Sequence, residues 1–176
     1  MLKRSLAALS SLIDHSVAEV RLSSATSARQ GVFSVASFIT EAKHAAALDA
    51  ASRGCDFQVA AVDPLLQTSG DRDVLLAALA NLLQNAFKFS HARTQVTLRA
   101  YAAGERVLIE IQDSCGGLKP GDAERMFTPF SRRSDDKSGM GLGLAIARQG
   151  IEAEGGILSV RNLPGTGCVF TVNLPA

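Results

Sequence analysis

Hydrophobic side chains near the start of the chain recur in steps of three and four residues. The series is Leu2, Leu6, Leu9, Ile13, Val17 and Val20. This spacing places one apolar stripe along a helix, of the kind that packs on a partner helix. The small polar run Ser23–Ser27 then separates this helix from the rest. We therefore expect a helical segment over residues 1–24 and a main domain over residues 28–176.

The main domain alternates between helical and strand periods. Helices are predicted over residues 31–51, 71–90, 122–126 and 140–154, with Gly54 and Gly155 placed as C-terminal stops. Strands are predicted over residues 56–62, 95–102, 106–112, 157–161 and 168–174. The turn at Ala103-Gly104 joins two of these strands into a hairpin, and the last two form another. Hairpins beside flanking helices predict an α+β fold, a two-layer sandwich with one helical face.

Composition narrows the class of protein. The chain has 176 residues, 47% of them apolar, and 18 basic residues against 17 acidic ones. This balance gives no sign of a nucleic-acid-binding surface or of a charge-driven contact with lipid. No apolar stretch is long enough to cross a membrane. Three scattered cysteines, Cys55, Cys115 and Cys168, suit free thiols in a reducing cytoplasm better than a disulfide framework or a zinc site.

The predicted helix over residues 71–90 carries the first polar cluster. Asn81, Asn85 and Lys88 follow one another at offsets of four and three, so they share one helix face. A neutral amide oxygen suits one position on Mg²⁺, and lysine supplies a positive charge for phosphate. The cluster therefore indicates a metal–polyphosphate site; the alternative is the solvated face of an amphipathic helix.

Asp113 ends a predicted strand just before Gly116 and Gly117. A carboxylate placed there can accept a hydrogen bond from the exocyclic amine of adenine, and it would repel the carbonyl that guanine presents. An ordinary Asp–Gly turn is the alternative interpretation.

Three alternating glycines, Gly139, Gly141 and Gly143, open the last predicted helix after a charged loop. Glycines let the backbone approach a phosphate, and a helix N-terminus favours an anion. No strand directly precedes them, which excludes a dinucleotide fold, and no Gly-Lys-Ser or Gly-Lys-Thr indicates a P-loop. A mobile lid over a nucleotide fits better. The aromatic segment from Met126 to Phe130 stands between this run and Asp113, and it is expected at least to anchor a loop on the core.

In order and spacing, these four elements resemble the N, G1, F and G2 boxes of histidine kinase catalytic domains. That family belongs to the wider class of gyrase-, heat-shock-90- and mismatch-repair-like ATPases. The resemblance covers residues 28–176 and implies a Bergerat-type fold that binds ATP and Mg²⁺. It implies Asn85 as the magnesium ligand and Asn85 with Lys88 as the catalytic pair. The implied nucleotide contacts are Asn81, Asn85, Lys88, Phe89, Asp113, Gly117, Phe130, Gly139, Met140, Gly141, Leu142 and Gly143.

Two positions depart from the family pattern. Cys115 stands where the first glycine of the G1 box falls, and Cys168 stands where a threonine is common in the closing strand. The second departure removes one expected hydrogen bond on the adenine side. Neither departure removes a metal or phosphate contact.

The resemblance also bears on the reaction. Hydrolytic relatives carry a glutamate as general base one helical turn before the magnesium-binding Asn, and this chain has Asn81 there. Phosphoryl transfer is therefore favoured over hydrolysis, because it depends mostly on positioning and charge. None of His15, His44 and His91 lies in a phosphoacceptor sequence. We expect the first helix to be the second half of a dimerisation hairpin whose acceptor histidine lies upstream in a longer protein.

These features predict an ATP-dependent protein-histidine kinase catalytic domain of a two-component phosphorelay. The expected partners are the acceptor hairpin of the same protein, a response regulator receiver domain and a second copy bound through the first helix. The expected location is the bacterial cytoplasm, with a membrane anchor elsewhere in a longer protein left open. The alternatives are a nucleotide-binding pseudokinase or response-regulator-binding module without transfer activity, and a serine kinase acting on an anti-sigma-factor partner.

Overall fold

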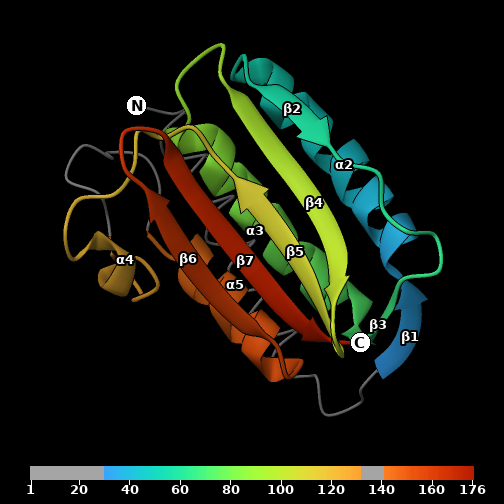
Figure 1. Ribbon diagram of the computed structural model, residues 1–176. Helices are drawn as coiled ribbons and strands as arrows, with labels where there is room; N and C mark the ends of the chain where they lie inside the picture. Colours follow the sequence, from blue (N-terminus) through green and yellow to red (C-terminus); the bar gives the residue numbers. More distant parts are fainter. Residues whose placement is uncertain (1–29, 132–140) are drawn as a thin grey trace, which may run out of the picture.

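The computed structural model describes residues 30–131 and 141–176 (Figure 1). The described elements, in chain order, are β1 (Gln30–Ser34), α2 (Val35–Ser52), β2 (Asp56–Val59), β3 (Gln67–Asp71), α3 (Arg72–Phe89), β4 (Gln95–Ala103), β5 (Arg106–Gln112), α4 (Asp122–Arg125), α5 (Gly143–Ala153), β6 (Ile157–Leu163) and β7 (Gly167–Pro175). The helix expected over residues 1–24 lies outside the described residues, so that segment stays a prediction. No helix in the described ranges is long and apolar enough to span a membrane.

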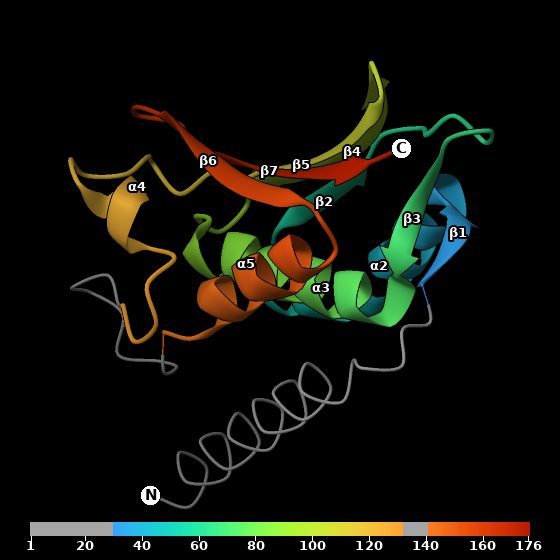
Figure 2. The ribbon, with the colours of Figure 1, turned by 90° about the horizontal axis from the view of Figure 1, so that it is seen from below.

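Five strands form one sheet in the order β2-β4-β5-β7-β6, and β1 pairs with β3 in a separate ribbon. Only β2 and β4 run parallel in the larger sheet, since the other neighbours are antiparallel. Helices α2, α3 and α5 lie side by side beneath one face of this sheet (Figure 2). The predicted α+β sandwich with one helical face is confirmed.

Alternation along the strands decides which sheet face the helices cover. On β4, Val96 and Leu98 are buried, whereas the next residue, Arg99, is exposed. Successive strand side chains point to opposite faces, so the apolar row meets the helices and the polar row meets solvent. Helix α3 supplies Leu82 and Phe87 to the core from below. The two hairpins β4–β5 and β6–β7 are those predicted from the sequence.

The first ribbon was not predicted. Residues 31–34 were expected to begin a helix, but they form β1 and pair antiparallel with β3. Helix α2 begins only after Ser34, whose side chain accepts a hydrogen bond from the Ser37 N–H at 3.3 Å. Pairing with a strand distant in sequence therefore overrides the local helical spacing at this point.

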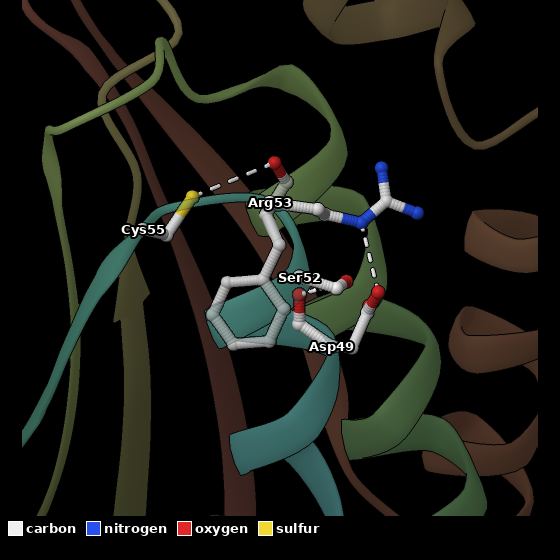
Figure 3. Close-up of polar contacts among 5 residues, drawn as sticks. Asp49, Ser52, Arg53 and Cys55 are labelled. Atoms are coloured by element: carbon white, nitrogen blue, oxygen red, sulfur yellow. Dashed lines mark hydrogen bonds and ion pairs between the residues drawn. The ribbon is translucent and has the colours of Figure 1, made fainter.

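The ends of the long helices follow local signals. Asp71 caps α3 by accepting from the N–H groups of Asp73 and Val74 at 3.0 and 3.2 Å. At the C-terminal end of α2, Arg53 pairs with Asp49 at 2.9 Å (Figure 3). The chain then turns at Gly54, which has a φ of 66°. This left-handed backbone conformation favours glycine at the position after the helix. Helix α5 begins at Gly143, three residues later than predicted.

Candidate functional site

Helix α3 presents its polar and apolar residues on separate faces, as the sequence predicted. Asn81, Asn85 and Lys88 are half-buried, whereas Leu82 and Leu83 between them are fully buried. Lys88 lies in the last turn, where a cation is favoured by the helix dipole, and its Nζ is 5.1 Å from the ring centroid of Phe89. The helix therefore aligns two amides and an ammonium along one side.

The start of α5 lies beside this polar face. A Cβ added at Gly143 would stand 3.7 Å from Oδ1 of Asn81, so the backbone of α5 runs close to that amide. A Cβ added at Gly150 would stand 3.2 Å from the side chain of Val74, so the lack of a side chain at this position lets α5 approach α3 closely. The structure thus brings the first polar cluster and the third glycine of the run together.

Asp113 follows the last residue of β5 and is only 2% exposed. Its Oδ1 accepts from the N–H of Cys115 at 3.2 Å and from the N–H of Cys168 at 2.8 Å. A Cβ at Gly167 would lie 2.0 Å from the Asp113 carbonyl oxygen, so only glycine fits at the start of β7. The carboxylate is therefore held in one orientation by two backbone donors from different segments.

The loop after Asp113 is fastened on both sides. The Ser114 N–H donates to Oγ of Ser90 at 3.0 Å, which joins the loop to the end of α3. The Asn162 side chain accepts from the Leu118 N–H at 2.8 Å and donates to the Leu118 carbonyl oxygen at 3.3 Å. Gly117, with a φ of 97°, passes directly against Asn162.

Ser90 and Asn162 are residues that the sequence analysis missed. Each acts on a segment at least 24 residues away, so no local spacing could identify them. The only sequence signal is weak: Asn162 stands just before the Leu163-Pro-Gly165 turn of the second hairpin.

The aromatic segment serves as an anchor. Phe127 packs edge-on against Phe170 of β7, with ring centroids 6.5 Å apart, which agrees with the expected loop anchor. Phe130 is instead 72% exposed and has a φ of 62°. The backbone of Gly141 passes against this point, since a Cβ there would lie 2.4 Å from the Ser131 carbonyl oxygen. Phe130 is thus close to the glycine run, while Gly139 and Met140 lie outside the described residues.

The fold and these clusters define a class of ATPase. The chain belongs to the family described as "Histidine kinase-, DNA gyrase B-, and HSP90-like ATPase", whose model matches residues 70–176. Its fold and its sequence are those of the ATP-binding catalytic domain of sensor histidine kinases.

Individual relatives agree with this assignment. The chain is 36% identical to the sensor histidine kinase ZraS of Salmonella typhi over 138 residues, which is 78% of this chain but only 29% of that protein. The mycobacterial sensor histidine kinase MprB superposes with a TM-score of 0.74 and 27% identity, covering 82% of this chain and 97% of that one. Full-length ShkA in complex with AMPPNP gives a TM-score of 0.83 and 28% identity, covering 99% of this chain and 37% of ShkA.

Proposed function

We propose that this chain binds Mg-ATP and transfers the γ-phosphate to a histidine on a dimerisation helix. The phosphorylated histidine then passes the phosphoryl group to a response regulator. The observation that carries the proposal is the buried carboxylate of Asp113, oriented by two backbone N–H groups. Membership of the ATPase family and the likeness to ShkA, whose structure holds AMPPNP, support a nucleotide at this place. The chain spans less than a third of ZraS, so the activity of a whole protein is part of the proposal.

Asp113 is proposed to read the base. The amine of adenine donates a hydrogen bond to the carboxylate, and such charge-assisted bonds are about twice as strong as neutral ones. Because Oδ1 is tied to the backbone on both sides, the carboxylate does not turn away when the base is absent. Guanine presents a carbonyl oxygen at the same position and is repelled, so the site prefers adenine.

The polar face of α3 is proposed to hold the phosphates. Asn85 offers an amide oxygen, the hard neutral ligand that suits Mg²⁺ when phosphates and waters complete the octahedron. The residues present fit this ion, because the face carries two amides and one cation and no competing soft ligand. When bound, Mg²⁺ neutralises charge on the phosphates. Lys88 adds a point charge, and Asn81 with the nearby Gly143 borders the phosphate tail.

Transfer is favoured over hydrolysis by the residue one turn before Asn85. Asn81 is an amide, so it cannot take a proton from water as a glutamate would. ATP bound here waits for another nucleophile. Within the described residues, neither His44 nor His91 lies in a phosphoacceptor sequence, so the acceptor is assigned to the dimerisation hairpin.

The decisive experiment supplies that hairpin as a separate polypeptide, together with this chain and ATP labelled at the γ-phosphate. The proposal expects acid-labile, alkali-stable label on the hairpin histidine, lost in Asn85→Ala. Gln84→Ala is the matched control, because Gln84 neighbours Asn85 but is exposed. ATP binding without any labelling of the hairpin would instead support a nucleotide-binding module with no transfer activity. Homodimerisation through residues 1–24, the receiver-domain partner and a location in the bacterial cytoplasm remain parts of this proposal.

A further inference from the structure

Two of the three cysteines meet beside the candidate base-reading carboxylate. The Sγ atoms of Cys115 and Cys168 are 3.4 Å apart, although the residues are separated by 53 positions. Cys115 is 8% exposed and Cys168 is 1% exposed. The two residues are far apart in the sequence, as expected, and pairing of β5 with β7 brings them together in space. None of the three cysteines, all of which lie in the described residues, forms a disulfide.

The pair is built into the same cluster as Asp113. The backbone N–H groups of both cysteines donate to Asp113 Oδ1, and the Asp113 N–H donates to the Cys168 carbonyl oxygen at 2.9 Å. One ligand atom from each of the three residues lies within 4.8 Å of the others. Any movement of one sulfur toward the other therefore acts on the two segments that orient the carboxylate.

The chemistry of the two thiols is unequal. A hydrogen bond from the Cys168 thiol lowers the pKa of Cys115, and this effect outweighs burial and the negative charge of Asp113, which oppose it. A lower pKa raises the fraction of thiolate, which is the form that attacks an oxidant. Cys115 is also the more exposed of the two, so it is the first to react, and Cys168 is in contact to complete the reaction.

We propose that Cys115 and Cys168 form a redox modification site that reacts with peroxides and weakens nucleotide binding when oxidised. The Cys115 thiolate attacks the peroxide O–O bond, forms a sulfenic acid and releases water after proton uptake. The Cys168 thiol then attacks that sulfur, which forms the S–S bond and releases a second water. Two thiols lose two electrons and two protons, and hydrogen peroxide is reduced to two waters. A dithiol reductant reverses the step by exchange.

The effect on the site follows from the packing. A disulfide bond is about 2.05 Å long, so the sulfurs must approach by roughly 1.4 Å. Cys168 belongs to β7, which is hydrogen-bonded to strands on both sides, whereas Cys115 lies in a loop. The loop therefore moves, and Asp113 shares its backbone. We expect the affinity for an adenine nucleotide to fall about tenfold, the lower end of the range for the loss of one hydrogen bond to a charged group. This part of the inference rests on the proposed function.

A metal site fits the same atoms less well. A structural zinc ion takes four ligands in a tetrahedron. In the described residues the cluster offers three, and Asp113 Oδ1 already accepts two backbone N–H bonds. Two thiols in contact with each other need no further ligand to react.

Cys55 provides a matched control in the same chain. Its thiol lies 3.8 Å from the carbonyl oxygen of Phe87 near the end of α3 (Figure 3). Burial raises the pKa of Cys55, so less thiolate is present to react. Cys55 should therefore remain a thiol under conditions that oxidise the pair.

The test treats the full chain with hydrogen peroxide, removes the oxidant, and measures free thiols in denaturant and binding of AMPPNP by calorimetry. We expect the three thiols of the reduced chain to fall to one, a Cys115–Cys168 cross-linked peptide by mass spectrometry, and binding weakened about tenfold. Dithiothreitol should restore both. Cys55→Ser should go from two thiols to none and lose affinity as the native chain does. In Cys115→Ser and in Cys168→Ser, peroxide should leave the affinity for AMPPNP as it was before treatment.

Three results would overturn the inference: all thiols surviving, oxidation without the cross-linked peptide, or a cross-linked chain that binds AMPPNP as the reduced chain does. The thiol count and the peptide do not depend on nucleotide binding. A reduced chain that fails to bind AMPPNP would therefore reject the proposed function and the switch, while the peptide would still report on the thiol pair.

Discussion

Replacing Asp113 with asparagine tests the proposed base contact with little disturbance of the fold. Asparagine keeps the Oδ1 acceptor, so the N–H groups of Cys115 and Cys168 retain their partner. It replaces the second oxygen with an NH₂ group, which is a donor and carries no charge. The amine of adenine then faces another donor in place of a carboxylate.

The expected loss follows from that exchange. A hydrogen bond to a charged group contributes about 1.5–3 kcal/mol. Since each 1.4 kcal/mol is about a tenfold change in affinity, Asp113→Asn should bind an ATP analogue roughly ten to 150 times more weakly. The same change removes the repulsion of guanine, so the preference for ATP over GTP should shrink together with the affinity.

The assay is calorimetric titration with AMPPNP, with and without Mg²⁺, on the native and substituted chains. Glu110→Gln is the matched control, because it makes the same acid-to-amide change on β5, three residues earlier. Glu110 pairs with Arg99 at 2.6 Å on the solvent-facing side of the sheet, away from the helices. Binding by Asp113→Asn within about twofold of native would refute the assignment of Asp113 to adenine.

Three further changes test other parts of the structure. Gly167→Ala would place a Cβ 2.0 Å from the Asp113 carbonyl oxygen, so chemical denaturation should show a loss of about 1–3 kcal/mol. Asp71→Ala removes the cap of α3 and should lower the free energy of unfolding by about 1 kcal/mol. Burial, and then the negative charge of Glu110, raise the pKa of Tyr101, so its absorbance titration should have a midpoint above that of free tyrosine. Glu110→Gln should bring that midpoint down.

Each of these has its own check. Gly31→Ala is the control for the glycine change, since nothing lies within 4 Å of its added Cβ, and an equal effect of both changes would contradict the packing argument. An unchanged unfolding midpoint in Asp71→Ala would contradict the capping role. The titration reports one group, because the chain has one tyrosine and no tryptophan. The raised pKa means that any stability tied to neutral Tyr101 persists at lower pH and is lost as the pH rises through that pKa.

Most elements of the fold could be predicted because their signals are local. The period of α3, its cap at Asp71 and the turn at Gly104 are all contained within short segments. The pair β1–β3 could not be predicted, because each strand has only five residues and the pairing joins Gln30 to Asp71 across the chain. A short strand takes its stability from its partner, and the partner is not visible in the local pattern.

The candidate site also has a part that local spacing predicts and a part that it does not. Asn81, Asn85 and Lys88 lie on one face of α3 because helical spacing alone requires it. The contacts that fix Asp113 depend on the register of β5 with β7, where Gln112 stands opposite Val169. A shift of one residue would turn Cys168 away from Asp113, so neither the carboxylate's second donor nor the thiol pair follows from the sequence.

The pairing of β5 with β7 also has a consequence for the order of folding. The hairpins β4–β5 and β6–β7 join neighbouring segments, whereas β5 and β7 are brought together across some sixty residues, as between Ile109 and Val172. Closing such a long loop costs entropy and makes this step slow relative to hairpin formation. Asp113 acquires the Cys168 donor only when this step is complete. A chain whose sheet is still open therefore lacks one of the two donors that orient Asp113. If Asp113 contacts the base as proposed, a nucleotide selects molecules whose sheet is already closed, so it raises the midpoint of thermal unfolding by mass action.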